Sequence, residues 1–469
     1  MPTWSPTLGL PWTETDLENA FEDALRVLSE IGIACEHQPT VECMQALGGI
    51  AYRNGRLRFD VAQTREHVLS RRYTGAPEPD DRQLSMGGCW AGLAYCDPET
   101  GTVRPGTTDE AVAMARLWEA RGYGGVPPLQ PGDVPPRLVT LTTERIGLLH
   151  SSRLGGSMTV TDPEEVRYLI AMNLAAGRVY HLVEQVPISP LRFDHLGLET
   201  ACQFLGQPDV NVSITGSIPM AGATCPLDPR SAIVQSVAEA IGHDLLCRAL
   251  GLDGGGLGLR VEPFDFQYSF IVFGSPEWCL YRALVIQMHH FLTGRPLRSG
   301  MFRSVAKGPD SQAASERTAS VLWQALLGVR SFGAVGQLSV DEIFSPQQAV
   351  IDQDILAYVQ RVIVGLPSGS GDPSHGGCDP VSGIAQGVAE GSFIGVDDTV
   401  ARFRDFYAFP ELFRHWNMGR WRGEGSPAIL DEAWARAREE IASCDFALSE
   451  HRTREVEQVY AAGVDYLRG

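Results

Sequence analysis

Residues 180–218 read YHLVEQVPISPLRFDHLGLETACQFLGQPDVNVSITGSI, and their pattern indicates the fold class. Two apolar runs, 180–188 and 210–218, flank the segment 196–204, whose apolar residues recur with helical spacing. A strand, a helix and a second strand in this order are typical of a βαβ unit, which places its two strands parallel in one sheet.

The same alternation continues on both sides of this stretch. Further strands are expected at 156–160, 258–261, 297–302 and 330–335, and further helices at 163–174, 231–250 and 277–292. Six or more such units without a GxGxxG fingerprint favour a closed barrel over a doubly wound open sheet. We therefore predict an α/β fold, a (β/α)8 TIM barrel, whose chemistry lies on the loops that follow the strands.

The chain divides into three predicted parts. Residues 1–106 form an N-terminal helix and hairpin subdomain, residues 107–395 the barrel, and residues 396–469 a C-terminal helical extension packed on the barrel. Asn54-Gly55 between two short apolar runs predicts a hairpin, and a second hairpin is expected around residues 95–103.

Two further local patterns concern a helix and a loop. Thr15 and Glu18 have the spacing of a capping box, which predicts a helix from there to Gly32. Residues 366–392 are rich in Gly, Ser, Pro and Asp and predict a loop, which holds His375 and Cys378. The sequence assigns these two residues no role.

Composition and charge exclude several classes of function. The 469 residues include 57 Asp+Glu against 38 Lys+Arg, a net charge of −19, which disfavours binding to a nucleic-acid backbone. No apolar run approaches the ~20 residues that span a bilayer, and no signal-peptide pattern is found, so we expect a cytoplasmic protein. The ten cysteines form no CxxC and no HExxH occurs, so we expect no metal site.

Several short segments together resemble a known family. They are ISPLRFD (188–194), IPMAGATCP (218–226), GSPE (274–277), RSG (298–300), KGPDSQA (307–313) and GSFIG (391–395). In this order they resemble the trimethylamine methyltransferase family, barrel enzymes that demethylate small methylamines and betaines. The resemblance implies a methyltransferase that moves a methyl group from a quaternary amine or betaine to the cobalt(I) of a corrinoid on a separate protein. We also expect a homo-oligomer.

One departure from the family narrows the substrate. The founding trimethylamine enzymes carry pyrrolysine in the segment that corresponds to residues 337–341, which here are QLSVD. The chain therefore looks like a non-pyrrolysine member, similar to the glycine betaine:corrinoid methyltransferases. Two alternatives stay open: methyl transfer without a corrinoid, for example with tetrahydrofolate, and non-catalytic binding of quaternary amines.

Candidate site residues follow from the chemistry of a methylated cation. A quaternary ammonium donates no hydrogen bond, so aromatic faces and carboxylates must hold it. The catalytic candidates are Glu262, Glu184 and Gln337, and the substrate-binding candidates are Met220, Phe264, Phe266, Tyr268, Phe302, Arg303, Asp310 and Gln312.

Several of these residues also admit a structural interpretation. Arg303 is expected to bind a substrate carboxylate through two hydrogen bonds, or else to lie in a surface loop paired with Asp310. Phe264 and Phe266 alternatively pack the barrel, and Glu184 alternatively makes a structural hydrogen bond.

Residues 403–421 contain seven large aromatic side chains with arginines between and beside them. Tryptophan, tyrosine and arginine are the residues that protein interfaces favour at their centres. The stretch is interpreted either as a docking surface for the corrinoid protein or as the packing of a C-terminal helix onto the barrel. The exposure of Trp416 and Trp421 separates the two interpretations.

Overall fold

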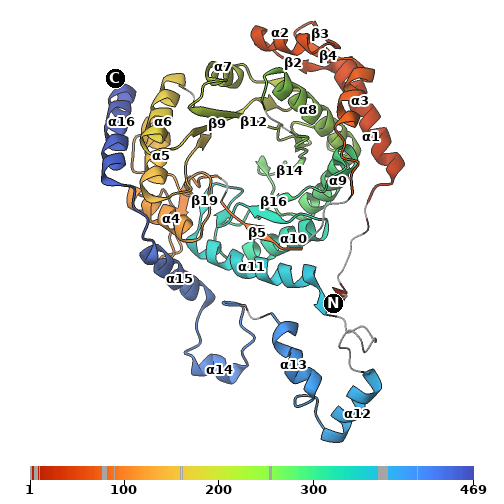
Figure 1. The fold of residues 1–469 in the computed structure, drawn as a ribbon, viewed down its shortest axis with the longest axis vertical. Coiled ribbons are helices and arrows are strands. Elements are labelled where there is room, and N and C mark those ends of the chain that lie inside the picture. The colour runs from red at the N-terminus through yellow and green to blue at the C-terminus, as the bar shows by residue number, and fades with distance from the viewer. Residues whose placement is uncertain are drawn as a thin grey trace.

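The computed structural model describes residues 3–4, 9, 11–76, 82–88, 90–158, 160, 162–252, 256–367, 379–408 and 410–468. Figure 1 shows a ring of helices around the central strands. These helices are α4 (Thr108–Ala120), α5 (Val139–His150), α6 (Pro163–Ala175), α7 (His195–Phe204), α8 (Pro229–Ala249), α9 (Pro276–Thr293), α10 (Ser311–Leu326) and α11 (Pro346–Val364).

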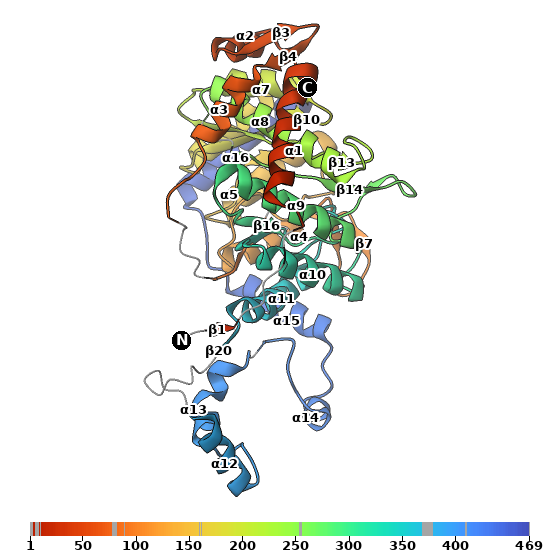
Figure 2. The same cartoon turned by 90° about the vertical axis from the view of Figure 1, so that its right-hand side faces the viewer.

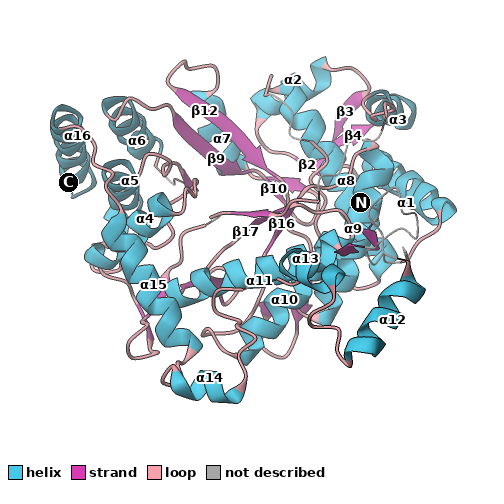
Figure 3. Ribbon diagram, turned by 60° about the horizontal axis from the view of Figure 1, so that its bottom comes forward, coloured by secondary structure: helices cyan, strands magenta, loops and turns pink. Residues whose placement is uncertain are grey.

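The strands inside the ring pair in parallel groups. β8 (Ser157–Met158), β9 (Tyr180–Gln185) and β12 (Val210–Thr215) form one group, and β16 (Ser299–Met301), β17 (Ser331–Gly333) and β5 (Ser85–Met86) form another. β13 (Met220–Ala221) runs parallel to β14 (Glu262–Asp265), which turns back into β15 (Phe270–Ile271). Figure 3 shows helices enclosing these strands, so the α/β class is confirmed.

The predicted βαβ unit at residues 180–218 forms β9, α7 and β12. Tyr180 pairs with Val210 and Gln185 with Thr215 in parallel register, as the βαβ interpretation predicts. Along β9 the side chains alternate: Tyr180 and Leu182 are buried against the helices, whereas His181 on the opposite face is exposed. Successive side chains of a β-strand point to opposite faces, so this alternation is what a strand at these residues predicts.

One expected strand is shifted. Residues 258–261 form no strand, and β14 begins at Glu262. The reason is a side chain: the Ser236 hydroxyl donates to the Arg260 carbonyl at 2.7 Å and accepts from the Arg260 amide at 3.1 Å. The backbone of Arg260 is therefore paired with helix α8 instead of a neighbouring strand.

The N-terminal part contains the predicted helix and hairpins. Its elements are α1 (Glu14–Arg26) with a π-helical turn (Val27–Ile31), β2 (Ile33–Ala34), α2 (Gln38–Ala46), β3 (Ile50–Arg53), β4 (Arg56–Phe59), α3 (Val61–Ser70), β6 (Ala94–Cys96) and β7 (Val103–Arg104). Both hairpins, β3–β4 and β6–β7, are confirmed. The capping box was misplaced by two residues, because Thr13 and Asp16 make the reciprocal hydrogen bonds.

The C-terminal part consists of helices with different surroundings. They are α12 (Pro380–Glu390), α13 (Asp397–Phe406), α14 (Met418–Gly423), α15 (Ile429–Ser443) and α16 (Glu450–Arg468). α15 packs on α4 and α11, and α16 packs on α5 and α6. Figure 2 shows α12, α13 and α14 extending away from the ring, at the end opposite to β3 and β4.

The expectation of a loop at residues 366–392 was wrong for its second half. Asp379 caps the N-terminus of α12 through the Ser382 amide, Pro380 occupies its first turn, and Gly391 ends it in a left-handed conformation. The many glycine and serine residues led to the expectation of a loop, although Asp379 and Gly391 are residue types that commonly begin and end a helix. His375 and Cys378 lie outside the described residues.

The remaining elements connect these parts. β10 (Pro187–Ile188) and β11 (Arg192–Phe193) join β2, β4 and β3 in one sheet, β18 (Gln337–Leu338) and β19 (Ile343–Phe344) join β6 and β7, and β1 (Thr3–Trp4) pairs with β20 (Leu366–Pro367). A short 3-10 helix (Pro136–Leu138) precedes α5. Among the described helices, none combines the length and the apolarity that a membrane crossing requires.

Candidate active site

A small cavity lies where β14 and β16 face each other. It has a volume of about 160 Å³, and the residues that line it include Arg260 and Glu262 beside β16 residues and Arg282 and Trp278 of α9. β14 and β16 belong to different sheets, so the cavity occupies a seam between two groups of parallel strands. The start of β14, the strand β16 and the N-terminal half of α9 therefore meet here.

Glu262 is the carboxylate of this seam. Its side chain is buried, and Oε2 accepts a hydrogen bond of 2.6 Å from the indole Nε1 of Trp278. Burial raises the pKa of Glu262, an effect that the positive charges of Arg303, Arg260 and Arg282 partly offset. The carboxyl group is therefore held by one directed donor inside a field of three guanidinium groups.

The three arginines enter the seam from three parts of the chain. Arg260 precedes β14, Arg282 lies on α9 and Arg303 follows β16. Arg282 donates to the Ser299 carbonyl at 2.9 Å and to Gln324 Oε1 at 3.3 Å, which holds its guanidinium against the edge of β16. Desolvation lowers the pKa of Arg282 to about 10, so it stays protonated at neutral pH.

Arg303 is buried, with 6% of its surface exposed. Its guanidinium lies 3.9 Å from the centroid of the Phe273 ring, a cation–π contact in a desolvated place. Burial raises the pKa of nearby Asp341, and the charge of Arg303 opposes that rise. The alternative of a surface loop was wrong, because Arg303 is buried; Asp310 caps α10 by accepting from the Ala313 amide at 3.0 Å.

The aromatic candidates lie on the β14–β15 hairpin. Phe264 is half-buried on β14, whereas Phe266 and Tyr268 in the turn are 62% and 73% exposed. Phe264 and Phe266 meet edge to face at 5.5 Å between centroids. Gly222, with φ of +89°, leaves room for the Phe266 ring, because an added Cβ would lie 2.4 Å from it.

The other candidates lie around this centre in supporting positions. Met220 pairs with Glu262 across β13 and β14, and Gln312 donates to Glu316 at 2.8 Å on α10. Phe302 is buried beneath the guanidinium of Arg317, 4.9 Å from its ring centroid. Gln337 is buried and donates to the Trp90 carbonyl.

Glu184 lies on β9, away from the seam. It is buried, its Oε1 has no hydrogen-bond partner among the described residues, and burial together with the charge of Asp194 raises its pKa to about 7. The alternative of a structural hydrogen bond is wrong for this oxygen. Glu184 is a buried acid that changes charge near neutral pH.

Three residues of the seam were not singled out in the sequence: Arg260, Arg282 and Trp278. A signal existed for Arg260, which stands two positions before Glu262 at the end of a predicted strand. Arg282 and Trp278 sit on α9, where i,i+4 spacing places both on one face, but the sequence does not tell which strand that face meets. In the described part of the chain, no group of three or more His, Cys, Asp or Glu side chains is placed to hold a metal ion.

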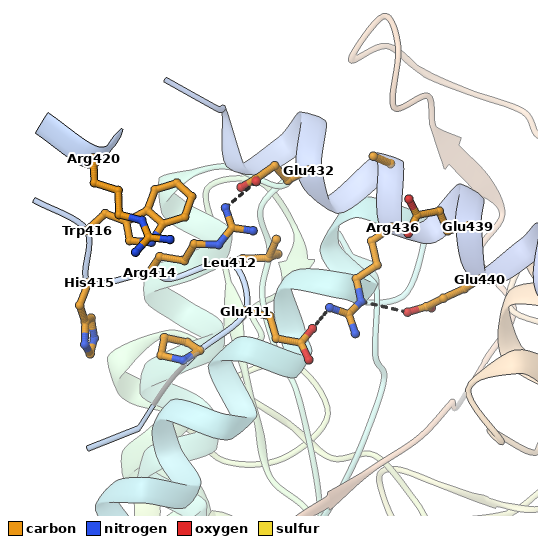
Figure 4. Close-up of a pocket in the computed structure, with 12 residues that line it drawn as sticks. Glu411, Leu412, Arg414, His415, Trp416, Arg420, Glu432, Arg436, Glu439 and Glu440 are labelled. Carbon is orange, nitrogen blue, oxygen red and sulfur yellow. Dashed lines mark hydrogen bonds and ion pairs between the residues drawn. The ribbon is translucent and has the colours of Figure 1, made fainter. Parts of the chain in front are cut away.

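A larger cavity lies elsewhere, between residues 410–416 and α15 (Figure 4). Its volume is about 930 Å³, and Trp416 lies between Arg414 and Arg420, whose guanidinium carbons are 4.6 and 5.3 Å from its ring. Arg414 pairs with Glu432, and Arg436 pairs with Glu411 and Glu440. These charges largely neutralise one another, whereas in the seam three arginines lie near Glu262 and Asp341.

Comparison with known proteins identifies the family. A family model described as trimethylamine methyltransferase (MTTB) matches residues 10–458. The chain belongs to this family. The resemblance inferred from the sequence motifs is thereby confirmed.

Individual members of the trimethylamine methyltransferase family differ in how much they share with the chain. Trimethylamine methyltransferase MttB of Methanosarcina thermophila is 30% identical over 248 residues, 51% of this chain and 48% of that protein. The chain thus spans about half the length of that relative. Glycine betaine methyltransferase of Desulfitobacterium hafniense (strain Y51) is 24% identical over 376 residues, 75% of this chain and 77% of that protein.

Among solved structures, the monomethylamine methyltransferase MtmB of Methanosarcina barkeri aligns with a TM-score of 0.47 at 12% identity, over 98% of this chain and 88% of that one. We take no argument about fold or function from a likeness of this degree.

Proposed function

We propose that the chain is a methyltransferase that moves a methyl group from a small N-methylated compound to the cobalt(I) of a corrinoid carried by a separate protein. The substrate class is a quaternary amine that also bears a carboxylate, that is, a betaine. The single observation that carries the proposal is the cluster of Arg260, Arg282 and Arg303 around Glu262, in a chain that belongs to the trimethylamine methyltransferase family.

The arginine cluster supports a carboxylated substrate. Three guanidinium groups against the carboxylates of Glu262 and the nearby Asp341 leave an excess of positive charge in a desolvated place, although the whole chain has a net charge of −19. A bound carboxylate would compensate that excess, and guanidinium groups bind carboxylates with two parallel hydrogen bonds. Arg260 and Arg303 are proposed to make these contacts, with Arg282 held against β16 as a fixed charge.

The methylated nitrogen would lie on the other side of the seam. A quaternary ammonium is attracted by aromatic faces and by carboxylates. Glu262 and the indole of Trp278, joined by their hydrogen bond, offer both in one place. The chain would thus orient the methyl group and exclude water from it, and a tertiary amine product needs no general acid to leave.

The corrinoid supplies the nucleophile of this reaction when its carrier protein docks. The β14–β15 turn fits such a partner, because exposed Phe266 and Tyr268 stand directly after the strand that carries Glu262. Exposed aromatic side chains beside a site are typical of a docking surface for a broad apolar group. We assign these two residues to partner docking instead of substrate binding.

The proposed framework is a (β/α)8 barrel with the three-part division at residues 1–106, 107–395 and 396–469. The parallel pairs within β8–β9–β12 and β16–β17–β5, together with the parallel bridges Gly92–Leu129 and Gly125–Leu154, support it. A cytoplasmic location and a homo-oligomeric assembly complete the proposal.

The test is a methyl-transfer assay that records the methyl-cobalt absorption of a reduced corrinoid protein. Glycine betaine and longer carboxylated betaines should be demethylated, and tetramethylammonium, which has no carboxylate, should react poorly. Arg260→Gln should lower kcat/KM for betaines by about a hundredfold while changing the reaction of tetramethylammonium little, since one charge-assisted contact contributes roughly 1.5–3 kcal/mol. Arg303→Lys should behave similarly.

Two results would overturn the proposal. Methyl transfer to tetrahydrofolate without any corrinoid would favour the folate alternative. Calorimetric binding of betaines without turnover under either acceptor would favour a non-catalytic binding protein.

A further inference from the structure

Another buried carboxylate, that of Glu239 on α8, accepts four hydrogen bonds. The residue is 3% exposed. Its Oε1 accepts from the Leu191 amide and from Gln235 Nε2, both at 2.9 Å. Its Oε2 accepts from the hydroxyl groups of Ser189, at 2.6 Å, and Ser217. A carboxylate has about four acceptor positions, so Glu239 is fully occupied and fixes its donors relative to one another.

The donors belong to two segments of the chain, each at one of the family motifs. Ser189 and Leu191 lie in the motif at 188–194, in the turn between β10 and β11, which share a sheet with β2, β4 and β3 of the N-terminal part. Ser217 directly precedes the motif at 218–226, which contains β13. Glu239 therefore ties both motifs to α8.

The contact with the second segment continues to the seam. Gln235, one helical turn before Glu239 and on the same face of α8, also donates to the Thr224 carbonyl at 2.8 Å. The Thr224 hydroxyl in turn accepts from the Met220 amide at 2.8 Å. Met220 pairs with Glu262 across β13 and β14. A continuous series of hydrogen bonds and strand pairing thus leads from Glu239 to the carboxylate of the seam.

We propose that Glu239 is a positioning residue, which holds segment 217–225 and through it sets the place of Glu262 in the seam. Resting on the proposed function, we assign to it the alignment of the methylated nitrogen for methyl transfer. The arginines that are proposed to bind the substrate carboxylate are anchored separately, because Ser236 holds the backbone of Arg260 and Arg303 follows β16. Loss of the Glu239 contact would therefore misplace the reacting end of the substrate while its carboxylate stays bound.

The experiment compares two serines that contact the same oxygen. Ser217→Ala and Ser189→Ala form a matched pair, since both serines are buried and both hydroxyl groups donate to Oε2 of Glu239. Each variant keeps three of the four donors, and urea denaturation should show that both remain folded. Ser217→Ala should lower kcat for glycine betaine by roughly ten- to a hundredfold and change KM by less than about threefold. Ser189→Ala should keep kcat within about twofold of the wild type.

Hydrogen exchange of the β14 amides provides a second measurement, which requires no substrate. The Glu262 amide donates to the Pro219 carbonyl at 2.9 Å, so a loosened segment 217–225 exposes that amide to solvent. Exchange in a peptide that contains residues 262–265 should be about tenfold faster in Ser217→Ala than in the wild type. Ser189→Ala should exchange at the wild-type rate.

Glu239 itself is tested by a conservative substitution. The carboxamide of Glu239→Gln keeps an oxygen for the Leu191 amide and Gln235, and its amino group can donate to the two serine oxygens. Glu239→Gln should therefore retain more of the wild-type kcat than Ser217→Ala does. A kcat for Glu239→Gln below that of Ser217→Ala would assign Glu239 a role beyond positioning and overturn the proposal.

The two measurements separate the possible failures. Equal kcat and equal exchange in the two serine variants would overturn the positioning role, because Glu239 would then support both segments alike. Faster exchange in Ser217→Ala with an unchanged kcat would overturn its part in methyl transfer. If the wild-type chain demethylates no betaine and exchange is faster only in Ser217→Ala, the positioning of Glu262 is supported and the proposed function fails.

Discussion

The indole Nε1 of Trp278 donates a hydrogen bond of 2.6 Å to Oε2 of Glu262 and ties the first turn of α9 to the first residue of β14. Both side chains are buried. Because α9 follows the β14–β15 hairpin, this contact holds the helix against the first strand of the hairpin and sets the position of the carboxylate relative to the arginines of the seam. It is therefore the first contact to test.

Trp278→Phe keeps most of the ring and removes the donor. It should lower the free energy of unfolding by about 1–3 kcal/mol, because Oε2 of Glu262 would be buried without that hydrogen bond. Urea denaturation at pH 7 measures the change. Trp323→Phe is the control, since Trp323 Nε1 has no hydrogen-bond partner among the described residues and its loss should change stability little. Equal effects of the two substitutions would contradict the assignment.

Glu184→Gln should stabilise the protein in a pH-dependent manner. The pKa of Glu184 is raised from 4.5 to about 7 in the folded state, so the native protein binds a proton that the unfolded chain has lost between these values. The contribution of Glu184 to the free energy of unfolding of the wild type is fully present below about pH 4.5 and is lost as the pH rises through 7. The variant should therefore match the wild type at pH 4.5 and exceed it by roughly 3 kcal/mol at pH 8. A difference that does not change with pH would refute the shifted pKa.

Asp352→Ala should be strongly destabilising. Asp352 and Arg317 are fully buried and paired, and Arg317 also donates to the Ala334 and Gln337 carbonyls, which shapes the loop after β17. Removal of the carboxylate leaves a buried unpaired guanidinium, for which a loss of about 3–5 kcal/mol is expected in chemical denaturation. Asp398→Ala, which breaks the surface i,i+4 pair with Arg402, should change stability by less than about 0.5 kcal/mol.

Phe266→Ala/Tyr268→Ala tests the docking role of the β14–β15 turn. Both side chains are exposed, so unfolding should be nearly unaffected. The concentration of corrinoid protein required for half-maximal methyl transfer should rise at least about tenfold, while calorimetric affinity for glycine betaine stays the same. Tyr358→Ala on α11, which removes another exposed aromatic side chain, should leave both quantities unchanged. A loss of betaine affinity in the double variant would show that Phe266 and Tyr268 bind the substrate, and would contradict the docking role.

Local patterns predicted much of the fold because they depend on neighbours in the chain. The period of β9 and β12, the helical spacing of α6, α7, α8 and α9, and the Asn54-Gly55 turn are all visible within about twenty residues. Errors arose where a distant side chain intervened, as when Ser236 of α8 engages the backbone of Arg260 and delays β14 until Glu262. The misplaced capping box has a different cause: Thr13 and Thr15 are both suitable N-cap residues, and the local sequence does not distinguish between them.

The sequence by itself determined the α/β alternation, the two hairpins and the motifs that place the chain in its family, because side-chain period and turn chemistry act over a few residues. The meeting of Arg260, Arg282 and Arg303 at Glu262, the burial of Arg303 and the exposure of Phe266 and Tyr268 became visible only in the folded chain. Those outcomes depend on distances between residues far apart in the chain. Such distances arise when helices pack on strands, and no local pattern encodes them.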